Sequence, residues 1–340
     1  MHIRNHYVPQ MYLRNWSDDG KTIMVYRTLV SRQDIDWWSR KSIDSIGYIQ
    51  HLYTQRIAAE ETDEFELWLD QEIESPAKDV IDKLICGRSL AENEYVILAR
   101  FIAAQIARTP GYFSENRQQW TDIFKKAIDG VVQGTLSSIN SGNYHNKIND
   151  TDRDSTDIKQ IPFKTSIIKA NDDDTSLLRV DTVIGRSMWL WYIKRIVKIS
   201  EDILSKHKWI IIEAAPGIEW PTSDDPVIRL NYYGENKYDF KGGINNIGSE
   251  ILLPISPKHL LYTQIGNDQS SNAIHKNTAL CELIRKIILE HAFMQIYSRE
   301  RQKGMLRYRP RTVNQNEYNR INEQFKNWHK NQSEGEADFF

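Results

Sequence analysis

The sequence has few cysteines and no long hydrophobic run. Its two cysteines, Cys86 and Cys281, are too few for a disulfide framework or a cysteine-rich zinc site. No apolar run approaches the length that spans a membrane, and the start lacks the basic-then-apolar pattern of a secretory signal. The net charge of −2 gives no overall attraction to nucleic acid. We therefore expect a cytoplasmic protein without a membrane segment.

Several familiar catalytic motifs are also absent. The sequence contains no Walker loop, no G-x-G-x-x-G motif and no H-E-x-x-H motif. It also lacks the G-x-S-x-G elbow and the set of kinase motifs. Nucleotide-loop enzymes, zincins and α/β-hydrolases are therefore weak candidates.

The apolar spacing that is present predicts an α+β fold, with a mostly helical bulk and a small antiparallel β-sheet. Helical periodicity over 62–86 and 89–108 predicts two long helices joined as a hairpin. Further helices are expected at about 176–206 and 273–299, with Tyr297-Ser298 as an alternative entry to a final strand. Short apolar runs predict antiparallel strands at 22–26, 209–213, 226–230, 251–255 and 260–263.

The chain divides into three parts by composition. Residues 1–135 hold short strands and the helical hairpin, and residues 177–340 hold a helix, the antiparallel strands and the closing helices of the same domain. Residues 136–176 are rich in Ser, Asn, Asp, Gly and Lys. Such a segment offers little apolar surface for burial, so we expect it to be a mobile insertion.

Two strings of aromatic and polar residues stand out. The first reads N-H-Y-V-P-Q-M-Y-L-R-N-W at 5–16, and the second reads W-P-T-S-D-D-P-V at 220–227. Chain termini are usually polar and frayed, so the aromatic first string is expected to be buried. Together the two resemble the family known as domain of unknown function 4238, whose members read N-H-Y-V-P-x-x-Y-L-x-N-[FW] and [FW]-x-T-S-D-[ND]-P-V. The resemblance extends from Asn5 to about Ser298.

His6 and Asp224 are the first candidates for chemistry. The pKa of a histidine lies near neutrality, so His6 suits a general base or a metal ligand; alternatively it forms a hydrogen bond that holds the N-terminal segment. Adjacent residues of an extended chain point to opposite faces, so only one of Asp224 and Asp225 should face a pocket. The family pattern favours Asp224, since it often has Asn at the position of Asp225. The competing interpretation of Asp224 is a turn cap.

Charged residues of the helical hairpin supply further candidates. Of Glu66, Glu72 and Glu74, the last falls between apolar positions, and its simplest partner is Arg100 or Arg108. Arg108 matches a family motif and suits either a helix C-terminus or a phosphate. The catalytic candidates are therefore His6, Glu74 and Asp224. The substrate-binding candidates are Arg14, Asn15 and Arg108, and the candidate metal ligands are Asp224 and Glu74.

Two functions fit this set. The first is metal-assisted hydrolysis of phosphodiesters in nucleic acid or a nucleotide. In such a reaction the carboxylates and His would bind a Mg²⁺ or Mn²⁺ ion, and Arg would neutralise the charge of the phosphate. By analogy alone, such a nuclease would serve bacterial defence against phage or act as a toxin. The alternative is a non-catalytic binding or sensor module, with a possible protein partner, whose polar motifs form a buried structural network.

Overall fold

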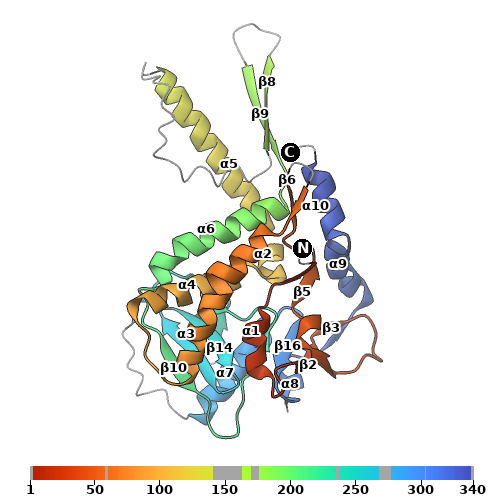
Figure 1. Cartoon of the computed structure of the whole chain (residues 1–340), viewed down its shortest axis with the longest axis vertical. Coiled ribbons are helices and arrows are strands. Elements are labelled where there is room, and N and C mark those ends of the chain that lie inside the picture. Colours follow the sequence, from red (N-terminus) through yellow and green to blue (C-terminus); the bar gives the residue numbers. More distant parts are fainter. Residues whose placement is uncertain are drawn as a thin grey trace.

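A computed structural model describes the chain at residues 3–57, 60–140, 163–169, 176–234, 237–267, 277–302 and 304–337. The predicted α+β class is confirmed, with long helices on one side of several small, mostly antiparallel sheets (Figure 1). Most of the predicted insertion at 136–176 lies outside the described residues. No helix in the described part of the chain combines the length and hydropathy needed to cross a bilayer.

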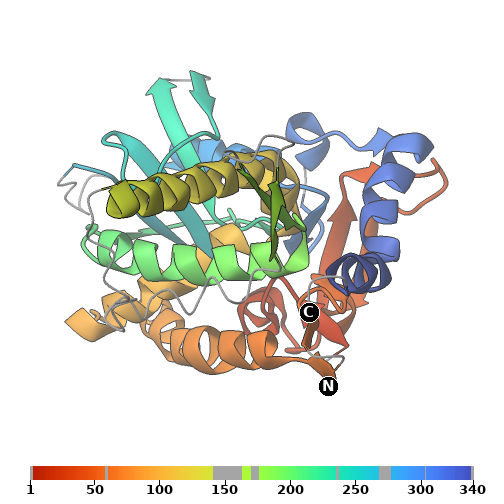
Figure 2. The ribbon, with the colours of Figure 1, turned by 90° about the horizontal axis from the view of Figure 1, so that it is seen from above.

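The helical layer contains the predicted hairpin. The first arm is continuous from α2 (Glu64–Trp68) through a π-helical turn (Leu69–Glu74) to α3 (Ser75–Ile85), and the second arm is α4 (Glu92–Ala107). The last seven residues of α4 are all buried, since this helix packs between α3 and α6 (Arg186–Leu204). Seen from above in Figure 2, α6 lies between α3 and α5 (Pro110–Asn140), and Figure 1 shows α5 rising away from α6.

Two larger sheets lie behind this layer. The five-stranded antiparallel sheet has the order β10 (Ile210–Glu213), β15 (His259–Gln264), β14 (Ser249–Ser256), β12 (Ile228–Gly234), β13 (Lys237–Asp239). The predicted antiparallel strands are thereby confirmed. The four-stranded sheet has the order β11 (Thr222–Ser223), β16 (Gln295–Ser298), β2 (Thr22–Arg27), β4 (Trp38–Ser42). Helix α7 (Thr278–His291) packs on the five-stranded sheet and leads into β16.

Short elements complete the described structure. The two-stranded pairs are β1 (Arg4–His6) with β5 (Tyr48–Gln50), β3 (Leu29–Val30) with β17 (Thr312–Val313), β6 (Gln55–Ile57) with β7 (Glu60–Thr62), and β8 (Phe163–Lys169) with β9 (Ser176–Thr182). The short helical pieces are α1 (Gln10–Leu13), the 3-10 turns Arg14–Trp16 and Ile43–Ser45, α8 (Met305–Tyr308), α9 (Gln315–Lys326) and α10 (Trp328–Glu336).

Two predicted helix boundaries are wrong. Residues 176–182 form β9, which pairs residue for residue with β8, and the helix starts only after Gly185. Glycine is a poor helix former, and the pairing partner in β8 could not be recognised from local periodicity. The predicted helix at 273–299 ends at His291, and the alternative strand at Tyr297-Ser298 is confirmed, because Gln295–Ser298 pair with β2 as β16.

The first aromatic string is buried, as predicted. Tyr12 and Trp16 are fully buried, and their polar atoms reach the second string. The Tyr12 hydroxyl lies 2.7 Å from Thr222 Oγ1 and donates to the carbonyl of Pro254 at 2.6 Å. Trp16 Nε1 donates to the carbonyl of Trp220 at 2.8 Å. Buried Tyr and Trp need such partners, so these bonds fix the two strings side by side.

Helix α10 is anchored in the body near the start of α6. The Glu336 carboxylate pairs with Arg186 and accepts a 2.6 Å hydrogen bond from Ser187 Oγ and one from the Ser187 N–H. Trp328 Nε1 donates to the carbonyl of Leu52 at 3.0 Å. Because Arg186 and Glu336 are both buried, this docking completes the interior around the α6 N-terminus.

Candidate functional site

An open groove of about 860 Å³ lies between the N-terminal segment and the π-helical turn. It is lined by three of the predicted residues, His6, Arg14 and Glu74, and by Gln10, Glu66 and Asp70. π-helical turns are rare and frequently occur at functional sites. This groove is therefore the best candidate for the location of the chemistry.

His6 presents an unprotonated nitrogen to the groove. The Gln10 side-chain amide donates to His6 Nε2 at 3.3 Å, and Arg14 Nη2 in turn approaches Gln10 Oε1 at 3.4 Å. Since Nε2 accepts, the ring proton is on Nδ1, where the backbone of Arg4 is its partner. Burial, followed by the positive charge of Arg108, lowers the pKa of His6 to about 4. The imidazole is therefore neutral at physiological pH.

The pKa of Glu66, in the same groove, is shifted in the opposite direction. Burial, followed by the negative charge of Glu74, raises the pKa of Glu66 to about 8. Its Oε2 is buried and has no hydrogen-bond partner among the described residues. A carboxyl of this kind carries a proton near neutral pH and can donate it. The sequence placed Glu66 on the hairpin but gave no sign that tertiary packing would bury it.

Arg108 is a buried anchor for Glu74. Its guanidinium is fully buried, and Nη1 lies 2.7 Å from Glu74 Oε1. Its Nε donates to the carbonyl of Tyr7 at 2.9 Å, and the Tyr53 hydroxyl donates to the Arg108 carbonyl at 3.1 Å. The expected partnership of Glu74 with a hairpin arginine is confirmed for Arg108. These contacts bind the guanidinium from behind the groove, away from solvent.

Asp224 ties two loops together inside the protein. Its Oδ1 accepts the N–H of Phe293 at 3.0 Å, and its Oδ2 accepts those of Met294 at 2.8 Å and Gln295 at 3.0 Å. Burial raises the pKa of Asp224 to about 7, although the three backbone hydrogen bonds act in the opposite direction. Asp224 is not among the residues that line the groove.

A family model covers residues 4–302 of the chain and carries the description "Protein of unknown function (DUF4238)". The chain belongs to the DUF4238 family. Searches of curated proteins and of solved structures found no match. Helices α9 and α10 of this DUF4238 protein lie beyond the matched residues.

The predicted site residues of this DUF4238 protein divide into two groups. His6, Arg14 and Glu74 line the groove, and Arg108 binds Glu74 from behind it. Asn15 instead donates through Nδ2 to the carbonyl of Ile255 at 2.8 Å, and Asp224 binds the loop before β16. Sequence reasoning did not select Glu66 or Asp70, which the fold brings to the same groove.

One set of three described side chains has the spacing of metal ligands: His51, Glu61 and His329, whose ligand atoms all lie within 4.8 Å of one another. Arg186 Nη1 donates to His329 Nδ1 at 3.0 Å, so the proton of the neutral ring is on Nε2. That nitrogen lies 2.7 Å from Glu61 Oε1. A metal would have to displace this proton while Nδ1 still faces a guanidinium, so the arrangement favours a hydrogen-bonded pair.

Proposed function

We propose that this DUF4238 protein is a cytoplasmic hydrolase of phosphodiester bonds and that the groove is its active site. The observation that carries the proposal is the pair formed by His6 and Glu66, one a neutral base and the other a protonated acid in a single groove. Titratable groups with pKa values pushed in opposite directions are typical of acid–base catalysis. A nuclease of this kind would suit a role in defence against phage or as a toxin.

In this mechanism the Gln10 amide gives up its hydrogen bond to His6 Nε2, which then accepts a proton from the attacking water, and Glu66 protonates the leaving oxygen. The low pKa of His6 makes the free imidazole a weak base, but a bound phosphodiester adds negative charge beside it. A nearby opposite charge favours the imidazolium, so substrate binding raises the pKa of His6 toward the working range. The same negative charge keeps Glu66 protonated until the leaving oxygen develops its charge.

Cations of the groove would bind the phosphate directly, and carboxylates of the groove would bind it through a metal ion. Arg14 and Lys78 line the groove and suit the phosphate oxygens. Mg²⁺ or Mn²⁺ would enter with the substrate, because Mg²⁺ commonly binds one or two carboxylates together with substrate phosphates and several waters. Asp70 and Glu74 are the groove carboxylates for that role.

The test is a hydrolysis assay with single-stranded and duplex DNA, RNA and bis-p-nitrophenyl phosphate, in Mg²⁺, Mn²⁺ or EDTA. His6→Asn and Glu66→Gln should each lower kcat about 100-fold or more, the usual contribution of one acid or base. Glu72→Gln is the matched control, since Glu72 is exposed on the same π-helical turn outside the groove. Wild-type protein that hydrolyses none of these substrates would exclude the proposal.

The second candidate is a non-catalytic binding or sensor module. It is favoured by the hydrogen bonds that tie the side chains of Arg108 and Asp224 to protein partners. Buried polar networks of this kind specify a unique fold. Under this alternative the groove binds a nucleotide or nucleic acid without turnover, and His6→Asn alters affinity only.

A further inference from the structure

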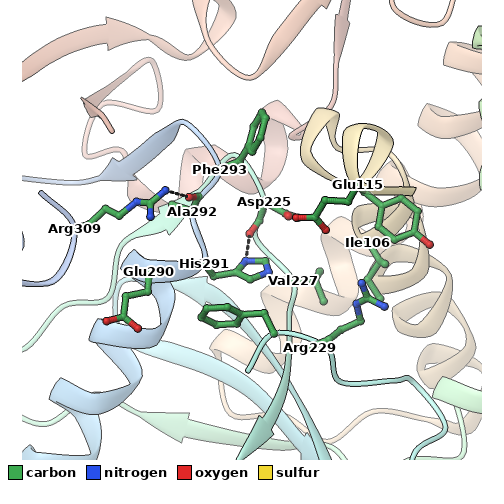
Figure 3. A pocket seen from close by; sticks show the side chains of 12 residues that line it. Ile106, Glu115, Asp225, Val227, Arg229, Glu290, His291, Ala292, Phe293 and Arg309 are labelled. Atoms are coloured by element: carbon green, nitrogen blue, oxygen red, sulfur yellow. Dashed lines mark hydrogen bonds between the residues drawn. The ribbon is translucent and has the colours of Figure 1, made fainter. Parts of the chain in front are cut away.

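A second cavity, of about 260 Å³, lies at the start of α5 and shares no lining residue with the groove. Its walls come from α5, from β12 and the loop before it, and from the end of α7 (Figure 3). Its polar lining includes Asp225, Glu115, His291 and Arg229. None of them takes part in the proposed hydrolysis.

Two carboxylates face each other across this cavity. Asp225 Oδ1 accepts a hydrogen bond from Thr109 Oγ1 at 3.3 Å. The other carboxylate oxygen, Oδ2, lies next to the backbone of Gly111, where an added Cβ atom would be 3.4 Å away from it. Figure 3 shows the side chains of Asp225 and Glu115 pointing toward one another. Burial raises the pKa of Asp225 to about 7; the positive charge of Arg229 opposes this shift, and the negative charge of Glu115 adds to it. The cavity therefore places two carboxylates close enough to act on one cation.

His291 adds a third acceptor. Its Nδ1 lies 3.1 Å from the backbone carbonyl of Asp225, and a carbonyl can only accept, so Nδ1 carries the proton. Burial lowers the pKa of His291 to about 4, so the ring is neutral and Nε2 keeps its lone pair. No described residue hydrogen-bonds to Nε2.

Arg229 supplies a positive charge in the same cavity. Its guanidinium lies over the ring of Tyr112, 5.7 Å from the centroid. It forms no hydrogen bond or ion pair with any other residue that the structure describes, although its charge acts on the pKa of Asp225. The other cavity arginine, Arg309, already donates to the carbonyl of Ala292 at 2.9 Å.

We propose that this cavity binds a free α-amino acid. The ammonium group of the amino acid has three N–H donors, which would be accepted by Asp225, Glu115 and His291 Nε2. Its carboxylate matches the planar fork of the Arg229 guanidinium. The volume corresponds to about eight or nine water molecules at roughly 30 Å³ each, which suits a small amino acid. Val227 and Phe240 provide apolar walls for an apolar side chain.

The test is calorimetric titration of the full chain with each of the twenty L-amino acids. At least one apolar amino acid should bind, whereas the corresponding amine without a carboxylate and the acid without an ammonium should bind at least tenfold more weakly. Arg229→Gln and Glu115→Gln should each weaken binding at least tenfold. Arg307→Gln is the matched control, because Arg307 is exposed and lies over the ring of Tyr308 at 5.9 Å.

Three results would overturn the proposal: no binding by any of the twenty amino acids, binding unchanged in Arg229→Gln, or binding of Mg²⁺ or Zn²⁺ alone at this site. Glu115 is exposed, so its variant should fold normally and keep the test valid if another variant does not. His6→Asn should leave amino-acid binding unchanged. The hydrolase proposal and the amino-acid proposal can therefore fail independently, because they concern different residues.

Discussion

The Thr109 hydroxyl donates a hydrogen bond to the Asp225 carboxylate across 3.3 Å, although 116 residues separate the two in sequence. The same Oγ1 accepts the N–H of Tyr112 at 3.2 Å and so caps the first turn of α5. The preceding residue, Arg108, holds Glu74 at the groove. Arg108 therefore supports the groove, and the next residue, Thr109, supports the cavity.

Thr109→Val should destabilise the protein by about 1 to 2 kcal/mol, because it removes a helix cap and the hydroxyl that donates to Asp225 Oδ1. Urea denaturation of the variant and the wild type measures this loss. Thr312→Val is the control, since Thr312 is exposed in β17. Equal midpoints for the two variants would contradict the structural role of Thr109.

Glu66→Gln should be more stable than the wild type above pH 8. The folded-state pKa of about 8 exceeds the ordinary value of 4.5, so the folded chain retains a proton that the unfolded chain loses. The stability that protonated Glu66 contributes is complete below pH 4.5 and is lost as the pH rises through 8. At pH 9 the variant should gain about 2 to 4 kcal/mol.

Chemical denaturation at pH 4.5 and pH 9 tests this prediction. The difference between Glu66→Gln and the wild type should be small at the lower pH and large at the higher one. Glu72→Gln, at an exposed position, should show no such pH dependence. A difference that does not vary with pH would mean that Glu66 is ionised in the folded protein.

Arg108→Met should cost about 3 to 5 kcal/mol, because it leaves the carboxylate of Glu74 and the carbonyl of Tyr7 without their buried partner. Arg100→Met is the comparison, since Arg100 forms a partly exposed ion pair with Glu201. Pairs of that kind contribute about 0 to 1 kcal/mol. Guanidinium denaturation of both variants would reveal the difference, and similar losses would show that Arg108 is not the anchor described above.

Asp224→Asn should lower stability by about 1 to 3 kcal/mol, because an amide NH₂ must face at least one backbone N–H that the carboxylate now accepts. Thermal unfolding at pH 8 measures the loss, with the exposed Asp79→Asn as control. Unchanged stability together with lost hydrolysis would instead favour the metal-ligand role that the sequence suggested for Asp224.

Local signals in the sequence predicted the fold class, the helical hairpin and the antiparallel strands, because these depend on apolar periodicity. Periodicity failed at 176–182, where pairing with β8 determines the conformation. It also could not foresee that Glu66 is buried beside His6, or that Asp225 lines a cavity while Asp224 binds a loop. Such outcomes depend on contacts between distant segments.

The dependence of α6 on Glu336 has a consequence for synthesis. The buried guanidinium of Arg186 receives its counter-ion from a residue 150 positions later in the chain. At about 5 to 20 residues per second, translation of that interval takes roughly 8 to 30 seconds. Throughout that time the first turn of α6 must remain hydrated, and the aromatic surface that Trp328 later covers is open to chaperones. The interior can therefore close only after the ribosome has made residue 336.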